Sequence, residues 1–153
     1  IKLGLYYKEQ LVSLMTFGEL RKNLGSDKKE GVFELLRFCN KLNTNVVGGA
    51  SRLLKYFENN FDYEEIISYA DRRWSNGNLY EKLNFNLISK SKPNYFYTKG
   101  EIREYRFKYR KDILVSEGHD KNKTEKQIMQ EEGYNRIYDC GTLKYNKTKK
   151  NQK

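Results

Sequence analysis

The stretch Asn45-Val46-Val47-Gly48-Gly49-Ala50 decides the fold, because it joins two different apolar patterns. Ahead of it, residues 32–39 form a compact apolar run that is typical of a strand covered on both faces. From Val46 onward, apolar residues recur at 46, 50, 53, 54 and 57, the spacing of an amphipathic helix. A further apolar run at 66–70 has the length of a strand. Strand, glycine turn, helix and strand in this order indicate an α/β fold.

A glycine turn before a helix is a candidate phosphate site. The first N–H groups of a helix have no partner within it, and they point along the positive end of the helix dipole. Glycine lets a ligand come close to the backbone there. From the spacing alone, a Gly-Gly pair that allows close packing at the start of the helix explains the sequence about as well as a phosphate site does. The candidate cofactor-binding residues are Asn45, Val47, Gly48, Gly49 and Ala50.

Apolar runs on either side of this unit predict further strands. Residues 1–7 and 11–17 flank Lys8-Glu9-Gln10 and predict a hairpin, which a polar loop at 20–31 follows. Beyond the strand at 66–70, we expect a short helix at 78–83 and strands at 85–88 and 95–98.

The C-terminal third has a different character. Residues 103–111 interleave basic and aromatic side chains, and as a strand they would place the rings on one face and most of the positive charges on the other. The basic face would then follow DNA phosphates, whereas a solvated edge strand is the alternative. Thr124-x-x-Gln127 predicts a helix capping box, and residues 134–145 predict a last hairpin. The candidate DNA-binding residues here are Arg103, Arg106, Lys108 and Arg110.

The charge of the chain is concentrated in the same third. Among 153 residues the net charge is +10, with 14 basic and 11 acidic residues through Ser91 but 16 and 9 from Lys92 onward. Such an excess suits a polyanionic partner. No apolar run is long enough to span a membrane. We expect three parts: a domain at 1–99, a basic extension at 100–146 and a disordered tail at 147–153.

The few cysteines and the single histidine limit the chemistry. Cys39 and Cys140 lack Cys-x-x-Cys spacing, and only His119 could join them, so no metal site is expected. Two isolated cysteines in a lysine-rich chain are typical of a reduced, cytoplasmic protein. Glu117-Gly118-His119-Asp120 could activate water in a nuclease, but a solvated turn is the simpler interpretation, and nuclease activity is not expected from these residues.

The glycine turn resembles the acyl-CoA pyrophosphate loop of the GNAT N-acyltransferase superfamily, Gln/Arg-x-x-Gly-x-Gly/Ala. Gly48 and Ala50 are in register, and Asn45 stands where the family usually has Gln or Arg. Tyr80-Glu-Lys-Leu-Asn-Phe85 is similar to the second GNAT signature, Tyr-x-x-Gly-Phe, with Asn84 in place of glycine.

The GNAT resemblance covers residues 1–99. It implies a mixed, mostly antiparallel twisted sheet with helices on its faces, without the family's first strand and helices. It also implies acetyl-CoA or a related acyl-CoA as cofactor. Tyr80 would be the general acid for the leaving thiolate, and a tyrosine that only packs the short helix is the alternative.

A narrower resemblance concerns proteins that act on DNA. Ser68-Tyr-Ala-Asp71, Gly77 and Tyr80 resemble the Mom-like branch of GNAT proteins, phage enzymes that modify adenine in DNA. A wider resemblance, to the C-terminal region of phage homing-endonuclease-type proteins, runs over nearly the whole chain. The segments that carry it are Leu11-Val-Ser-Leu-Met-Thr-Phe17, Glu34-Leu-Leu-Arg-Phe-Cys-Asn40, Gly48-Gly-Ala-Ser51, Ser68-Tyr-Ala-Asp-Arg-Arg-Trp-Ser75 and Arg136-Ile-Tyr-Asp-Cys-Gly141. A Vsr-like nuclease domain commonly precedes that region. The resemblance therefore implies DNA and an attached or associated nuclease domain as partners, in the cytoplasm of a phage host.

The segment after the strand at 66–70 carries the remaining candidates. Ser68 and Asp71 are the other candidate catalytic residues, and Asp71 could orient or deprotonate an amine, or simply pair with a nearby arginine. Arg72, Arg73 and Trp74 are candidates for nucleic-acid contacts, since an exposed indole can stack on a base or merely anchor its loop.

Three functions follow from these observations. The preferred one is a DNA-associated transferase-type domain, either an acyltransferase or an enzyme that modifies a nucleobase. A catalytically silent DNA-binding or positioning module for a nuclease is the second. The third, a free-standing small-molecule acetyltransferase, is disfavoured by the basic extension.

Overall fold

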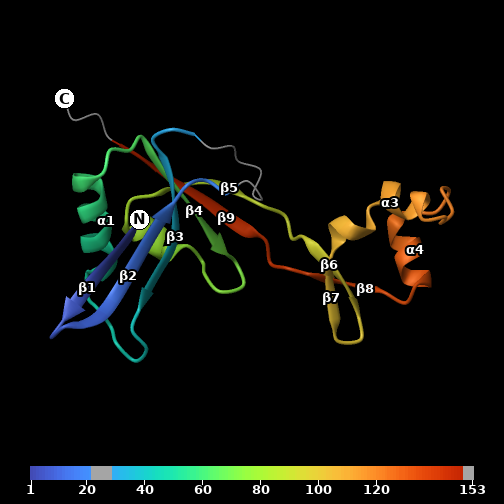
Figure 1. Cartoon of the computed structure of the whole chain (residues 1–153), viewed down its shortest axis with the longest axis horizontal. Coiled ribbons are helices and arrows are strands. Elements are labelled where there is room, and N and C mark those ends of the chain that lie inside the picture. Colours follow the sequence, from blue (N-terminus) through green and yellow to red (C-terminus); the bar gives the residue numbers. More distant parts are fainter. Residues whose placement is uncertain (22–28, 150–153) are drawn as a thin grey trace. The chain divides into compact units, whose positions relative to one another are not determined.

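The computed structural model describes residues 1–21 and 29–149, and it divides the chain into two compact units. The main unit comprises Ile1–Lys90 and the stretch from Thr142 onward, and the small unit comprises Ser91–Gly141. Figure 1 shows the main unit built around a twisted sheet, with the helix α1 beside it. None of the helices in the described ranges is long and apolar enough to cross a membrane.

In its described part, the main unit contains a six-stranded sheet with the order β1-β2-β3-β4-β9-β5. Only β3 and β4 are parallel, and every other neighbouring pair is antiparallel. Two helices connect the strands, and the second is one short turn. The bounds are β1 Lys2–Tyr7, β2 Gln10–Gly18, β3 Val32–Asn40, α1 Gly49–Asn60, β4 Glu65–Asp71, α2 Asn78–Lys82, β5 Asn86–Lys90 and β9 Thr142–Thr148.

The core of the main unit forms where α1 packs against the sheet. Phe57 is fully buried, and its ring stacks on that of Phe17 at 3.8 Å between centroids. The rings of Phe33, Phe61 and Tyr63 surround it on other sides. The helical apolar period that begins at Val46 therefore ends in this aromatic cluster, which holds α1 to β2 and β3.

Strands β3 and β4 pair over a short length and then part. Their parallel register runs only from Val32↔Glu65 to Glu34↔Ile67. On the other edge of β3, the register with β2 shifts between Leu35 and Arg37, so that Leu36 has no partner. Such a bulge bends a strand and increases its twist. The bend comes where the pairing of β3 with β4 ends, and the part of β3 beyond it lines a pocket; we call this place the crevice.

The small unit, which is described throughout, pairs three strands with helices on one side. The strand order is β7-β6-β8, and both pairings are antiparallel. Tyr97, Leu114, Ile128 and Met129 form a separate hydrophobic core under the helices. The bounds are β6 Tyr95–Lys99, β7 Ile102–Tyr105, the 3-10 helix η2 Arg106–Tyr109, α3 Lys111–Ser116, α4 Glu125–Glu131 and β8 Asn135–Tyr138.

Most of the expected elements are confirmed. The hairpin of β1 and β2, strands β3 to β6 and helices α1 and α2 lie close to the predicted ranges. The capping box is confirmed too: Thr124 Oγ1 accepts from the Gln127 N–H, and Gln127 Oε1 accepts from the Thr124 N–H. Of the polar loop expected at 20–31, residues 22–28 lie outside the described residues.

Two predictions for the C-terminal third are wrong. Residues 103–111 are not one strand, because β7 ends at Tyr105 and the chain turns into η2 and then α3. The half-buried Tyr109 of η2 packs on the small core, which a straight strand could not reach. Residues 134–145 are not a hairpin either, because β8 pairs with β6 whereas β9 pairs with β4 and β5.

The expected part boundaries also differ from the two units. The small unit starts at Ser91 rather than at residue 100, and Thr142 returns the chain to the main sheet. Lys147 and Thr148, expected in a disordered tail, belong to β9 and pair with Ile66 and Glu65.

The aromatic cluster predicts a large, local stability effect. Phe57→Ala should lower the free energy of unfolding by about 3–5 kcal/mol, because it removes a fully buried ring from the centre of the cluster. Tyr56→Ala, at the next position of the same helix, removes a ring that is 55% exposed and should change stability by less than about 1 kcal/mol. Chemical denaturation of both variants measures the difference. Equal losses would contradict the placement of α1.

Candidate functional site

The crevice between β3 and β4 brings two of the three predicted catalytic residues together. The Ser68 hydroxyl is buried and donates to the Leu35 carbonyl oxygen of β3 at 2.8 Å. Tyr80 Oη lies 2.9 Å from Ser68 Oγ and also donates to the Tyr69 carbonyl oxygen at 3.3 Å. The two hydroxyls therefore meet where the backbone pairing of the strands ends.

The ring of Tyr80 is held from two sides. It stacks on Tyr145 of β9 at 4.7 Å between centroids and meets Phe85 edge-on at 5.7 Å. Asn84 has a φ of 59°, the left-handed conformation that glycine and asparagine adopt most readily. Asparagine thus supplies the backbone turn for which the GNAT signature has glycine, and the Phe85 N–H returns to the Tyr80 carbonyl oxygen at 2.9 Å.

The electrostatic surroundings keep Tyr80 protonated. Burial raises the pKa of the Tyr80 hydroxyl above its ordinary value, and the hydrogen bond with Ser68 opposes this only in part. The negative charge of Glu34 raises the pKa further. At neutral pH the phenol is therefore a proton donor, the form that a general acid needs.

A pocket of about 320 Å³ lies next to this hydroxyl pair. Its wall is the part of β3 that no longer pairs with β4, together with one side of α2. Backbone groups of a strand that lacks a neighbour are open to a ligand that runs alongside it. The lining residues are Leu35, Leu36, Arg37, Phe38, Cys39, Leu79 and Tyr80.

The N-terminus of α1 lies beside the same part of β3. Gly49 is buried, and a Cβ there would lie 3.4 Å from Ser13 Oγ, which itself donates to the Cys39 carbonyl oxygen at 3.4 Å. Gly48 has a φ of 70° with open space around it, and no side chain caps the helix. Asn45 and Val47 are exposed in the loop ahead, and Ala50 begins the helix packing. The five predicted cofactor residues thus lie together at the start of α1, and Gly49 is linked through Ser13 to Cys39 at one end of the pocket wall, but none of the five lines the pocket.

Glu34 was missed by the sequence analysis. Its carboxylate is almost fully buried, yet it lies in β3 among apolar residues and pairs with the Arg21 guanidinium, whose Nε donates at 2.8 Å. The hydrogen bond to Glu34 raises the pKa of Arg21. The signal was present in the sequence, since an acidic residue inside the apolar run Val32-Phe-Glu-Leu-Leu36 needs a buried partner.

The remaining candidates of the main unit lie on an exposed turn after β4. Asp71 Oδ1 accepts from the Arg73 N–H at 2.8 Å, and the Asp71 carbonyl accepts from the N–H groups of Trp74 and Ser75, so Asp71 organises its own turn. Arg73 lies over the Trp74 ring at 4.7 Å, and the indole is 77% exposed. Arg72 belongs to the same turn. The structure does not bring Asp71 into hydrogen-bonding contact with Tyr80 or Ser68.

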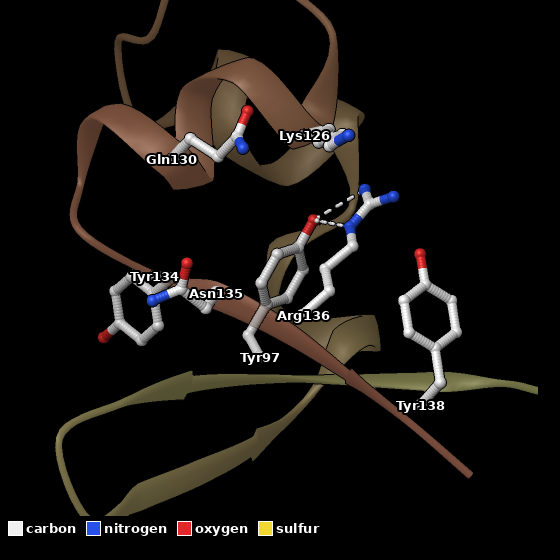
Figure 2. Close-up of a pocket in the computed structure, with 7 residues that line it drawn as sticks. All are labelled: Tyr97, Lys126, Gln130, Tyr134, Asn135, Arg136 and Tyr138. Carbon is white, nitrogen blue, oxygen red and sulfur yellow. Dashed lines mark hydrogen bonds between the residues drawn. The ribbon is translucent and has the colours of Figure 1, made fainter.

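A second pocket, of about 220 Å³, belongs to the small unit. Figure 2 shows Arg136 rising from β8 beside Tyr97, with Lys126 and Gln130 above them on α4. Arg136 donates to Tyr97 Oη from Nε and Nη2, and Nη2 also reaches Glu125 Oε1 at 3.2 Å. The Arg136 guanidinium thus makes its hydrogen bonds within the small unit, where it also neutralises the Glu125 carboxylate.

The predicted DNA-binding residues of the small unit occupy different surroundings. Arg103 lies over the Phe96 ring at 3.8 Å, and Arg106 lies between Tyr95 and Phe107 at 5.0 and 5.3 Å. Lys108 pairs with Glu104 at 2.9 Å and Arg110 with Asp112 at 3.2 Å, both as exposed ion pairs.

Comparison with solved structures identifies the fold. The chain is similar to an acetyltransferase of the GNAT family from Bacillus cereus ATCC 10987, with a TM-score of 0.51 and 11% identity over 97% of this chain and 70% of that one. No known family profile matches the sequence, and no curated protein matches it. The fold is therefore a mixed α/β GNAT-like fold, which confirms the predicted fold class.

The close contact between Gly77 and Tyr145 predicts a second stability effect. A Cβ at Gly77, whose φ is 92°, would lie 1.8 Å from Tyr145 Oη. Gly77→Ala should therefore displace Tyr145 or α2 and cost at least about 2 kcal/mol more than Gly48→Ala, which carries similar backbone strain in open space. Thermal and chemical unfolding of the two variants give the comparison. A smaller cost at Gly77 would contradict the packing of α2 on β9.

Proposed function

We propose that the main unit is an acyltransferase-type domain that binds an acyl-CoA along the free part of β3. The observation that supports this most directly is the meeting of a half-buried, protonated tyrosine with the open edge of a parallel strand pair. The residues present fit the ligand, because the pocket beside Tyr80 is lined by β3 from Leu35 to Cys39, and no side chain caps the N-terminus of α1. A bound acyl-CoA would supply the activated thioester.

Residues of this chain would act at the two ends of the bound acyl-CoA. The N–H groups of Ala50 and Ser51 in the first turn of α1, which follow Gly48 and Gly49, would hold phosphate oxygens. Tyr80 Oη carries a proton that it can give to a leaving thiolate, and Ser68 orients it. Asn45 offers an amide at the position where the GNAT signature has Gln or Arg, so the phosphate site has less positive charge.

Acetyl-CoA should raise the melting temperature of the full chain, because a ligand that binds only the folded state stabilises it. Ser51→Glu places a carboxylate in the first turn of α1 and should weaken binding about fivefold or more by repelling phosphates. The same substitution favours the helix dipole, so the unliganded protein should not lose stability.

Ser51→Gln is the matched control, since it has nearly the same shape without the charge. Isothermal titration and melting curves with acetyl-CoA measure both effects. The absence of any shift for the unaltered chain at millimolar acetyl-CoA would overturn the proposed cofactor and would favour the silent module.

A second candidate function is association with DNA, as part of a phage homing-endonuclease-type protein with a nuclease domain. The observation that favours it is the charge of the chain from Lys92 onward, with 16 basic and 9 acidic residues. A nucleobase amine in DNA would then be the acceptor of the Mom-like reaction. If the domain is instead a catalytically silent module, its contacts with DNA would position the nuclease, and Tyr80 would have only a structural role.

The DNA association predicts a strong dependence on salt. Replacing Arg106, Lys108 and Arg110 together by Ala should weaken binding and should reduce the slope of log K against log salt by about 2–3. Replacing Lys2, Lys8 and Lys55 of the main unit, which removes the same charge, is the control. Fluorescence anisotropy with a labelled oligonucleotide measures the slope, and equal changes in both triple variants would argue against a site on the small unit.

A further inference from the structure

The sheet of the small unit has one face that its helices do not cover. Tyr97 on β6 is buried under α3 and α4, so its neighbours Phe96 and Thr98 point to the opposite face. The register places Tyr105 and Arg103 of β7 beside these two residues, and Ile137 and Asn135 of β8 on their other side. We call this set the open face: Phe96, Thr98, Arg103, Tyr105, Asn135 and Ile137.

The open face carries exposed rings that touch one another. Tyr105 is 60% exposed and meets Phe96 edge-on at 5.1 Å. Phe107, which follows in η2 and is 54% exposed, lies nearly parallel to Tyr105, with 6.3 Å between centroids and 19° between planes. Ile137 is 52% exposed on the neighbouring strand. So much apolar surface in one place is expected at a binding site.

The charge of the open face is positive. Arg103 covers one face of the Phe96 ring, and no ion pair joins it to a carboxylate within the described ranges. Glu104, the acidic residue of β7, points to the helix side, where it pairs with Lys108. Arg106 adds a second guanidinium next to Phe107. A partner that covers this surface must therefore offer flat apolar groups and negative charge together.

We propose that the open face binds single-stranded DNA, with bases stacked on Tyr105, Phe107 and the Arg103–Phe96 pair. Unstacked bases present the flat surfaces that aromatic rings and guanidinium planes bind, and the phosphates between them meet the arginines. A duplex offers only base edges and backbone, because its bases are already stacked on each other. Thr98 and Asn135 form the next row of the sheet, in register with Arg103 and beside the rings, and can hydrogen-bond base edges. The inference rests on the DNA association proposed above and specifies its ligand.

The test compares a labelled oligo-dT 20-mer with a duplex and an RNA of the same length, using the full chain and fluorescence anisotropy. The single strand should bind more tightly than the duplex. Tyr105→Ala and Phe107→Ala should each weaken single-strand binding about fivefold or more, the loss expected for one stacked base. Arg103→Ala should weaken binding and reduce the salt slope by about 0.7, the value for one phosphate contact on a single strand.

Tyr56→Ala is the control, since it removes an equally exposed ring from α1 of the main unit and should leave binding unchanged. Circular dichroism establishes that each variant folds, and Tyr105→Phe keeps the ring and should retain binding. Duplex binding that depends on Arg106, Lys108 and Arg110 but not on Tyr105 or Phe107 would overturn the open-face site and leave the DNA association intact. A lack of binding to every nucleic acid would overturn both, and tighter binding of RNA would overturn the choice of DNA.

Discussion

The parallel pairing of β3 with β4 is the constraint on which the main unit depends. A parallel pair needs a crossover connection, and α1 supplies it by packing its aromatic face on the sheet. The pairing ends after Glu34 because the bulge at Leu36 bends β3 away. Ser68 then bridges the strands through its hydroxyl, so the crevice begins at a defined point rather than by gradual fraying. Tyr80, the pocket and the α1 N-terminus are all arranged around that point.

Much of this arrangement was predictable because local patterns encode it. The change from strand to helix period at Val46 located α1, and the resemblance of Gly48, Ala50 and Tyr80 to the GNAT signatures suggested the candidate site. Asn84 looked like a departure from the GNAT signature, but its positive φ performs the role of the glycine. Backbone conformation, rather than residue identity, was the requirement at that position.

The rest depended on contacts between distant segments. Nothing local in residues 142–148 shows that they insert between β4 and β5, because strand order depends on tertiary packing. Residues 103–111 alternate like a strand, yet residues 106–109 form a 3-10 helix, in which the half-buried Tyr109 packs on a core made by β6, α3 and α4. The sequence signals that Glu34 needs a buried partner, but that the partner is Arg21, on a separate segment, depends on the tertiary structure.

The position of the small unit between β5 and β9 has an evolutionary consequence. Lys90 and Leu143 are register partners, and a Cβ at Gly141 would lie 2.6 Å from the Ser91 carbonyl oxygen, so the chain leaves the sheet and comes back at nearly the same place. A short turn could close the same gap. The 91–141 segment is therefore topologically an exchangeable cassette, which a GNAT-like sheet can gain, lose or replace without changing its own hydrogen bonding.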